Sequence, residues 1–298
     1  MNKWARRIGL LLIALLCAGS GLALAGKIMG ERKMARSIAV PAALLAVAPD
    51  PARIEQGRYL FNTRGCADCH GSDGAGKTVI DDGAMLVVSP NISSGDNSVT
   101  RHYRAVDWVR TVRHGVKPDG TPVLIMPSDD YNRLTDADMA ALMSFLMQLP
   151  PVPGRAAVVR LPVPAKALYG LGALKDSAEK IDHSLPPSIP VAAEVSVAHG
   201  AYVANTCMGC HGPHLAGGKI AGAPPSWPAT ANLTPGKGSV MPRYPSAEAF
   251  MATLRSGKRP DGSAISEVMP FGSFKQMNDT DLRALYAYLK TLPPRETN

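Results

Sequence analysis

Two short stretches decide the fold of this chain: Cys66-Ala67-Asp68-Cys69-His70 and Cys207-Met208-Gly209-Cys210-His211. Each has the pattern C-x-x-C-H, in which two thiols add across the vinyl groups of a haem and the adjacent histidine binds the iron. The two motifs use four of the five cysteines. Zinc binding is an alternative, as is a thioredoxin-like redox site, but zinc needs a second ligand pair near each motif, and no such spacing is present. The sequence therefore predicts two covalently attached haem c groups.

The sequence around the motifs is also duplicated, at an offset of 141 to 143 residues. The matching segments are Asn91-Ile92-Ser93 with Asn232-Leu233-Thr234, Arg113 to Gly120 with Arg255 to Gly262, Met126-Pro127 with Met269-Pro270, and Leu134 to Pro151 with Met277 to Pro294. A repeat of this length indicates one domain built twice. We place a first domain at residues 51–150 and a second at 195–298.

The matched Met-Pro pairs predict the second axial ligand of each iron. Met126 and Met269 follow their histidines by 56 and 58 residues, and the proline after each restricts the methionine to extended backbone. Methionine opposite histidine raises the reduction potential of a haem in an electron carrier. One alternative is a methionine that is only packed in its loop. His114 is expected at the surface or in a loop, and the alternatives for it are a propionate partner or an iron ligand in the first domain. Met139, Met143 and Met147 recur at helical spacing and are predicted to be core.

Helical patterns dominate both domains, so the predicted fold class is all-α. Each domain opens with a helix, expected over residues 52–63 and 197–205, that carries a Gly-x-Tyr triplet (Gly57 to Tyr59 and Gly200 to Tyr202). We expect each glycine to pack against another helix, because glycine otherwise lowers helix propensity. Each domain closes with a helix capped by Thr135 or Asn278, buries an apolar stripe (Leu142, Phe145, Leu146; Leu285, Tyr288, Leu289), and ends at a double proline.

These motifs resemble those of tandem class I cytochrome c domains, and the whole chain is similar to the membrane-anchored di-haem c-type cytochromes of bacteria. Such proteins are similar to the cytochrome subunits of periplasmic alcohol, aldehyde and gluconate dehydrogenases, although those subunits often carry three haems. The resemblance implies haem attachment at four cysteines and iron ligation by two histidines and two methionines: Cys66, Cys69, Cys207, Cys210, His70, Met126, His211 and Met269.

By the same resemblance the chain is an electron carrier without catalytic residues. It would pass electrons from a periplasmic dehydrogenase to a quinone-linked complex, a terminal oxidase or a soluble cytochrome of the respiratory chain. The alternative is a di-haem enzyme of the peroxidase or thiosulfate-oxidising type with one open haem site. The duplicated Met-Pro pair argues against an open site.

The first fifty residues predict a location in the membrane. Ile8 to Ala25 is an uncharged apolar run of 18 residues behind Lys3, Arg6 and Arg7. That length lies between a signal-peptide core and a spanning helix, and Ala23-Leu24-Ala25 would serve as a cleavage site. We expect an uncleaved N-terminal anchor in residues 1–50, with the haem domains in the periplasm because the basic end stays in the cytoplasm.

The net charge of +8 does not indicate a nucleic-acid partner. Residues 1–50 hold 7 basic and 2 acidic side chains, whereas the first domain is net −2 and the second is net +4. The excess therefore belongs mainly to membrane topology, and the opposed domain charges predict two different redox partners. Residues 151–194 form a proline-rich, semi-rigid linker with a short helix expected near residues 165–181. We expect the domains to pack together, because rapid transfer between haems needs a short gap.

Overall fold

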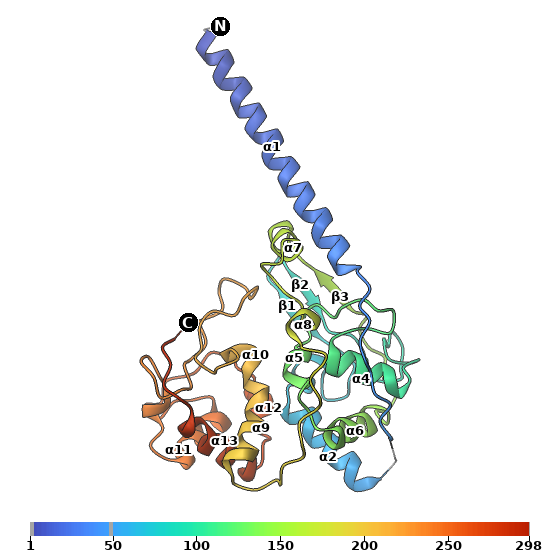
Figure 1. Ribbon diagram of the computed structural model, residues 1–298, viewed down its shortest axis with the longest axis vertical. Helices are drawn as coiled ribbons and strands as arrows, with labels where there is room; N and C mark the ends of the chain where they lie inside the picture. The colour runs from blue at the N-terminus through green and yellow to red at the C-terminus, as the bar shows by residue number, and fades with distance from the viewer. Residues whose placement is uncertain (1–2, 48–49, 298) are drawn as a thin grey trace.

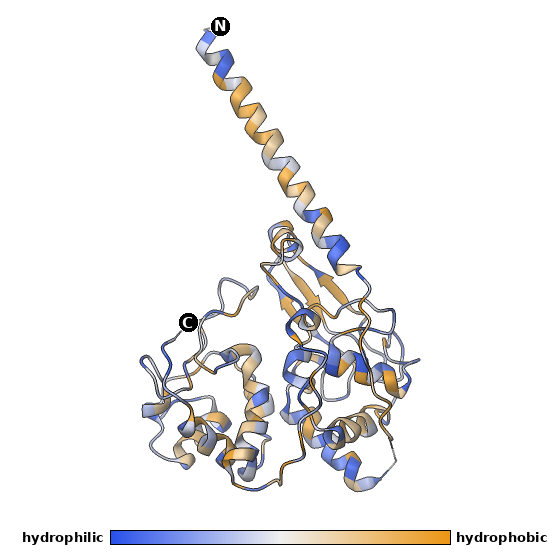
Figure 2. Cartoon of the chain, in the orientation of Figure 1, coloured by the Kyte–Doolittle hydropathy of each residue, from blue (hydrophilic) through white to orange (hydrophobic). Residues whose placement is uncertain are grey.

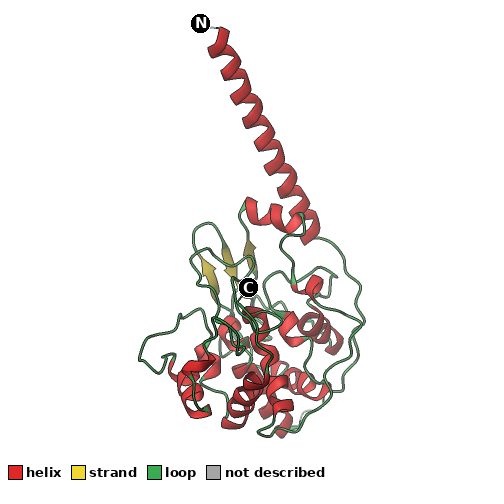
Figure 3. Ribbon diagram, turned by 60° about the vertical axis from the view of Figure 1, so that its left-hand side comes forward, coloured by secondary structure: helices red, strands yellow, loops and turns green. Residues whose placement is uncertain are grey.

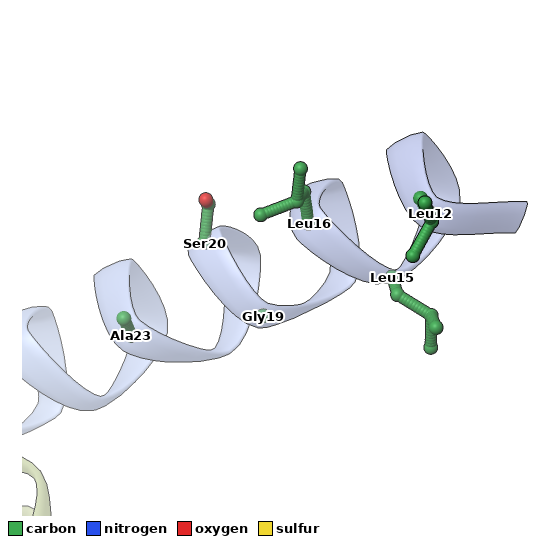
Figure 4. Close-up of a pocket in the computed structure, with 6 residues that line it drawn as sticks. All are labelled: Leu12, Leu15, Leu16, Gly19, Ser20 and Ala23. Atoms are coloured by element: carbon green, nitrogen blue, oxygen red, sulfur yellow. The ribbon is translucent and has the colours of Figure 1, made fainter. Parts of the chain in front are cut away.

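The computed structural model describes residues 3–47 and 50–297, so four positions of the predicted anchor segment (1, 2, 48 and 49) lie outside it. Helix α1 (Lys3–Met34) projects alone from the body of the molecule (Figure 1). Of the described helices it is the one long and apolar enough to cross a membrane, and a signal sequence would pass the same test. Figure 2 shows apolar colour along the middle of α1 and hydrophilic colour at its start and in its last turns next to the body. The hollow in Figure 4 is lined by α1 residues alone.

The first domain is mostly helical. Its helices are α2 (Pro51–Thr63), α3 (Cys66–His70), α4 (Ala105–His114), α5 (Ser128–Tyr131) and α6 (Asp136–Leu146). Helices α2 and α6 pack face to face, and a Cβ placed on Gly57 would lie 2.0 Å from the carbonyl oxygen of Ala141. The predicted close packing at this glycine is confirmed.

The second domain repeats the arrangement. Its helices are α9 (Val197–Ala204), the 3₁₀ turn η1 (Asn205–Cys207), α10 (Met208–His211), the 3₁₀ turn η2 (Met241–Arg243), α11 (Ala247–Ser256), α12 (Phe271–Phe274) and α13 (Asp279–Thr291). Helices α9 and α13 pack as α2 and α6 do, with Gly200 against the Ala284 carbonyl. A mostly helical fold with two such domains behind a long apolar helix confirms the predicted class.

The structure also contains a small antiparallel sheet, which was not predicted. Strand β1 (Thr78–Asp81) pairs with β2 (Leu86–Val88), and β2 pairs with β3 (Val158–Arg160). Figure 3 shows the three strands beside the helices of the body. Because β3 belongs to the linker, the sheet fastens the start of the linker to the first domain.

The linker then forms two helices, α7 (Val163–Gly170) and α8 (Ser177–Lys180), in place of the one expected near residues 165–181. Gly172 ends the first of them with a φ of 82°, a conformation that favours glycine. Helix α7 packs on α1, and α8 packs on α5 of the first domain.

Two predictions about single residues are wrong. Met139 and Met143 are buried as expected, but Met147 is half exposed because it is the C-cap of α6 and lies beyond its packed face. His114 was placed at the surface or in a loop, yet it lies buried in the last turn of α4, with Nδ1 3.0 Å from Nδ1 of His183.

Candidate haem-binding sites

Both C-x-x-C-H motifs form a short helical turn. The first is α3, and the second spans η1 and α10. Gly71 and Gly212 follow the two histidines with φ of 79° in each case, which a side chain would strain. The chain therefore turns sharply directly after each histidine.

The two histidine rings are held in the same way. Nδ1 of His70 lies 2.9 Å from the carbonyl oxygen of Pro90, and Nδ1 of His211 lies 2.8 Å from that of Ala231. Because a carbonyl only accepts hydrogen bonds, Nδ1 carries the proton and Nε2 keeps its lone pair. Burial lowers the pKa of both rings, which favours the neutral form that binds metal. A neutral imidazole oriented through its other nitrogen fits an iron ligand.

A buried asparagine holds each of these carbonyl groups in place. Asn91 follows Pro90 and donates through Nδ2 to the carbonyl oxygens of Asp96 and Val152, each at 2.8 Å. Asn232 follows Ala231 and donates in the same way to Arg295, at 2.8 Å, and to Lys237. Sequence reasoning found these asparagines as part of the repeat but gave them no role. The sequence signal that could have indicated a role is that each asparagine recurs two positions before a Ser or Thr.

Three of the motif cysteines, Cys66, Cys69 and Cys207, are partly buried, and Cys210 is exposed. Burial raises the pKa of Cys66 to about 12 and that of Cys207 to about 12. Each of the two packs against the hydrophobic core of its own domain. All four motif cysteines are free, as addition of a thiol across a haem vinyl group requires.

The two candidate methionine ligands lie at equivalent places, each partly buried against the same core as its motif. Their surroundings differ on one point. Oγ of Ser177, in α8, lies 2.8 Å from the carbonyl oxygen of Met126 and 2.7 Å from Oδ1 of Asp129, so its single hydroxyl hydrogen is shared between these two acceptors. Within residues 3–47 and 50–297, no side chain donates to the carbonyl oxygen of Met269. The linker thus supports the methionine loop of the first domain only.

Each motif lies at the interface between the domains. Oδ1 of Asp130, four residues after Met126, accepts a 2.8 Å hydrogen bond from the backbone N–H of Gly209 in the second motif. Ser273 stands four residues after Met269, and its Oγ donates to Asp68 in the first motif at 2.5 Å. Burial, with help from Asp129, raises the pKa of Asp130 to about 8. Each methionine segment therefore contacts the haem motif of the other domain.

A second pair of contacts obeys the same two-fold relation. The Tyr59 hydroxyl donates to Asp281 at 2.8 Å, and the Tyr202 hydroxyl donates to Asp138 at 2.5 Å. Each hydroxyl also accepts a 3.2 Å hydrogen bond from the backbone N–H of the helix N-cap residue three positions before that acid. The tyrosines of the two Gly-x-Tyr triplets thus bind the first turn of the other domain's last helix.

The two halves of this interface differ in charge. Asp281 also binds Nη2 of Arg64 at 2.8 Å and Nε2 of His199 at 2.7 Å, and all three side chains are buried. Burial opposes ionisation of Asp281, but the charge of Arg64 and these hydrogen bonds outweigh it and lower the pKa of the carboxyl. Asp138 has Tyr202 and Gln56 as side-chain partners instead.

Comparison with known proteins agrees with this geometry. The sequence pattern of the cytochrome c family matches residues 54–150 and again residues 197–293. The chain belongs to the cytochrome c family. A cytochrome c domain implies haem c, and two such domains occur in tandem.

This cytochrome is distantly similar to subunits of dehydrogenase complexes. It is 28% identical to the fructose dehydrogenase cytochrome subunit of Gluconobacter japonicus over 81% of this chain and 53% of that protein. It is 27% identical to the cytochrome c subunit of a quinone alcohol dehydrogenase of Gluconobacter oxydans, over 90% of this chain and 62% of that subunit. A diheme c-type cytochrome of Cereibacter sphaeroides is 29% identical over 81% of this chain and 86% of its own length. The chain therefore spans just over half the length of the dehydrogenase subunits it matches.

Proposed function

We propose that this cytochrome is a di-haem electron carrier that passes electrons from a periplasmic dehydrogenase toward the respiratory chain. The observation that carries the proposal is the pair of histidines, each fixed by a backbone carbonyl so that Nε2 is free, in two motifs that both lie at one domain interface. A haem bound at each motif supplies a one-electron couple at its iron. The protein then has only to hold, tune and shield two such groups.

The proposed ligand sets are His70 with Met126 and His211 with Met269, and the thioether bonds form at Cys66, Cys69, Cys207 and Cys210. The histidines are oriented by Pro90 and Ala231, and the methionine loops lie against the same cores as the motif cysteines. Both irons would be six-coordinate, which suits electron transfer and leaves no position for a substrate.

The interface supports transfer between the two haems within one chain. Each motif there contacts the methionine segment of the other domain, Gly209 with Asp130 and Asp68 with Ser273. This arrangement places the attachment turns of both haems at one seam, so an electron need not cross a whole domain.

The names of the relatives support a dehydrogenase as the electron donor. We propose a quinone-linked complex, a terminal oxidase or a soluble cytochrome as the acceptor, and α1 as an uncleaved anchor in the bacterial inner membrane. The mass of the mature protein tests the anchor: a chain that starts at Gly26 would contradict it.

Spectroscopy of the purified protein tests the carrier function. We expect two haems per chain in a pyridine haemochrome assay, two low-spin ferric signals, methionine-to-iron charge-transfer absorption, and no carbon monoxide binding by the reduced form. Met126→Ala and Met269→Ala should each convert one haem to a form that binds carbon monoxide. A high-spin haem in the unmodified protein that binds carbon monoxide would instead favour the di-haem enzyme.

A further inference from the structure

Helix α7 meets α1 in a close backbone contact. A Cβ on Gly26 would lie 2.6 Å from Cβ of Ala167, and one on Gly30 would lie 2.3 Å from the carbonyl oxygen of Lys166. A Cβ on Gly170 would in turn lie 2.7 Å from the backbone nitrogen of Gly30. The absence of side chains at these three positions lets the two helices touch, so α7 has a fixed place on α1.

Ion pairs around the contact hold α1 to the linker. Lys166 binds Glu31 at 2.8 Å, and Lys33 binds Glu179 at 2.9 Å. Arg36 binds the buried carboxylate of Asp176 at 2.7 Å. These ion pairs attach the C-terminal end of α1 to the body. The orientation of α1 is therefore fixed relative to the haem domains.

The contact lies at the level where a membrane would end. The apolar run Ile8 to Ala25 covers about 27 Å at 1.5 Å per residue, close to the roughly 30 Å hydrocarbon core of a bilayer. Gly26 follows this run directly, and it is the first of the glycines that touch α7. Figures 1 and 3 show α7 lying across the direction of α1, which is the direction of a helix parallel to the bilayer surface.

The outer face of α7 is apolar and exposed. Leu171, its C-cap, exposes 68% of its surface, Leu168 exposes 46%, and Val163 exposes 40%. On α1 the exposed residues Ile28 and Met29 continue this apolar surface toward the lipid-facing run. Tyr169 is buried, so α7 has one face on the protein and one face open. One apolar face on a short helix at the membrane boundary is typical of interfacial helices.

We propose that α7 is seated in the headgroup region of the bilayer, with Val163, Leu168 and Leu171 (the α7 apolar face) in contact with phospholipid. The inference rests on the proposed function only in taking α1 as a membrane anchor. Its consequence is that two contacts, the spanning helix and the α7 apolar face, fix the orientation of the haem domains above the membrane.

Photo-crosslinking in lipid nanodiscs tests this contact. The full chain carries the photoreactive amino acid p-benzoylphenylalanine in place of Leu171, and nanodiscs of phosphatidylcholine and phosphatidylglycerol are irradiated. Mass spectrometry of the chain should then show the mass of one added phospholipid. Ile189 is the matched control, because it is 83% exposed in the connection between α8 and α9. The same replacement there should give no lipid adduct.

A third position separates failure of this inference from failure of the anchor. Leu12 lies within the apolar run of α1, so p-benzoylphenylalanine in its place should capture lipid whenever α1 spans the bilayer. Lipid capture at position 12 without capture at 171 would overturn the inference and leave the anchor standing. A cross-link from 171 to a second copy of the chain would overturn it in favour of a protein contact. Capture at neither position would contradict the anchor as well, and the haem spectra of the same sample report separately on the carrier function.

Discussion

At the scale of single residues, one difference between the two candidate iron sites is a hydroxyl beside the methionine ligand. Ser177 donates to the carbonyl oxygen of Met126, and Met269 has no such side-chain donor among the described residues. A neutral hydrogen bond of this kind contributes about 1 kcal/mol, which corresponds to roughly a fivefold change in an equilibrium constant. The linker therefore stabilises one methionine loop and leaves the other to its own packing.

We predict that Ser177→Ala loosens the methionine ligand of the first haem. Imidazole should displace Met126 from the ferric protein at roughly fivefold lower concentration, because displacement no longer breaks the hydrogen bond. Loss of the methionine-to-iron charge-transfer band during an imidazole titration measures this. Ser184→Ala is the control, since that exposed linker serine bonds only its neighbour Asp182. Equal titrations for the two variants would exclude a positioning role for Ser177.

At the scale of helices, one glycine in each domain lets the backbones of the first and last helix pack in direct contact. Ala141 and Ala284 oppose Gly57 and Gly200 with their carbonyl oxygens, so any side chain at either glycine must push the helices apart. The contact also sets the position of the C-x-x-C-H turn, which follows the first helix directly.

We predict that Gly57→Ala lowers the free energy of unfolding of the first domain by about 3 kcal/mol, the upper end of what overpacking usually costs. Thermal unfolding followed by haem absorbance measures the change. Glu55→Ala, on the exposed side of the same helix, should lower it by less than about 1 kcal/mol, because its ion pair with Arg58 is exposed. A Gly57→Ala protein as stable as the Glu55→Ala protein would mean that the helices separate without cost.

The sequence predicted features that depend on short-range order. Thr135 and Asn278 cap their helices through hydrogen bonds from the N–H of Asp138 and Asp281, at 3.0 and 2.8 Å, as their spacing indicates. The sheet escaped prediction because its strands have three or four residues, too few to show alternation.

Features that depend on the other domain could not be predicted. The carboxylates of Asp138 and Asp281 look like ordinary first-turn acids, yet both bind a tyrosine some 64 and 222 residues away in the chain. The hydrogen bonds from the histidines to Pro90 and Ala231 could not be predicted for a related reason. Their acceptors are backbone carbonyl oxygens, which every residue type carries. The repeat located the motifs, and only the packed structure gave their partners.

At the scale of the whole molecule, the buried carboxylate of Asp281 joins the two domains. It accepts hydrogen bonds from Tyr59 and Arg64 of the first domain and contacts His199 of its own. Its lowered pKa means that the folded state favours the ionised carboxylate. The stabilisation is therefore complete above the ordinary aspartate pKa of about 3.9 and is lost as the pH falls through the lower pKa of the folded state.

We predict that Asp281→Asn lowers the free energy of unfolding by about 3 kcal/mol at pH 7, because Arg64 keeps a buried charge without its partner. The deficit relative to the unmodified protein should shrink as the pH falls below about 4. Denaturant titrations at several pH values measure both effects. Asp279→Asn, which removes an exposed ion pair with Arg255, should cost less than about 1 kcal/mol. A deficit independent of pH would show that the charge of Asp281 is not what matters.

The opposed charges of the domains lead to a kinetic prediction. Reversing the charges of Lys258 and Arg259, in the basic second domain, should slow electron exchange with one redox partner by about tenfold at low ionic strength. The effect should fade near 0.15 M salt, where the screening length is about 8 Å. Stopped-flow rates with donor and acceptor measure it, and the unaffected partner serves as the internal control. Unchanged rates with both partners would refute separate docking surfaces.

The reciprocal contacts between the domains have the form of an isologous dimer interface, in which residue i of one copy meets residue j of the other and j meets i. Tyr59 and Asp281 mirror Tyr202 and Asp138, and Asp68 and Ser273 mirror Gly209 and Asp130. Two copies of a single-domain protein would meet in the same reciprocal way in a homodimer. Because here both domains belong to one chain, the two sides need not be identical, and Arg64 and His199 each occur on one side only. In the proposed carrier, this asymmetry would give the two haems different surroundings and so different reduction potentials, and that difference would set the preferred direction of an electron.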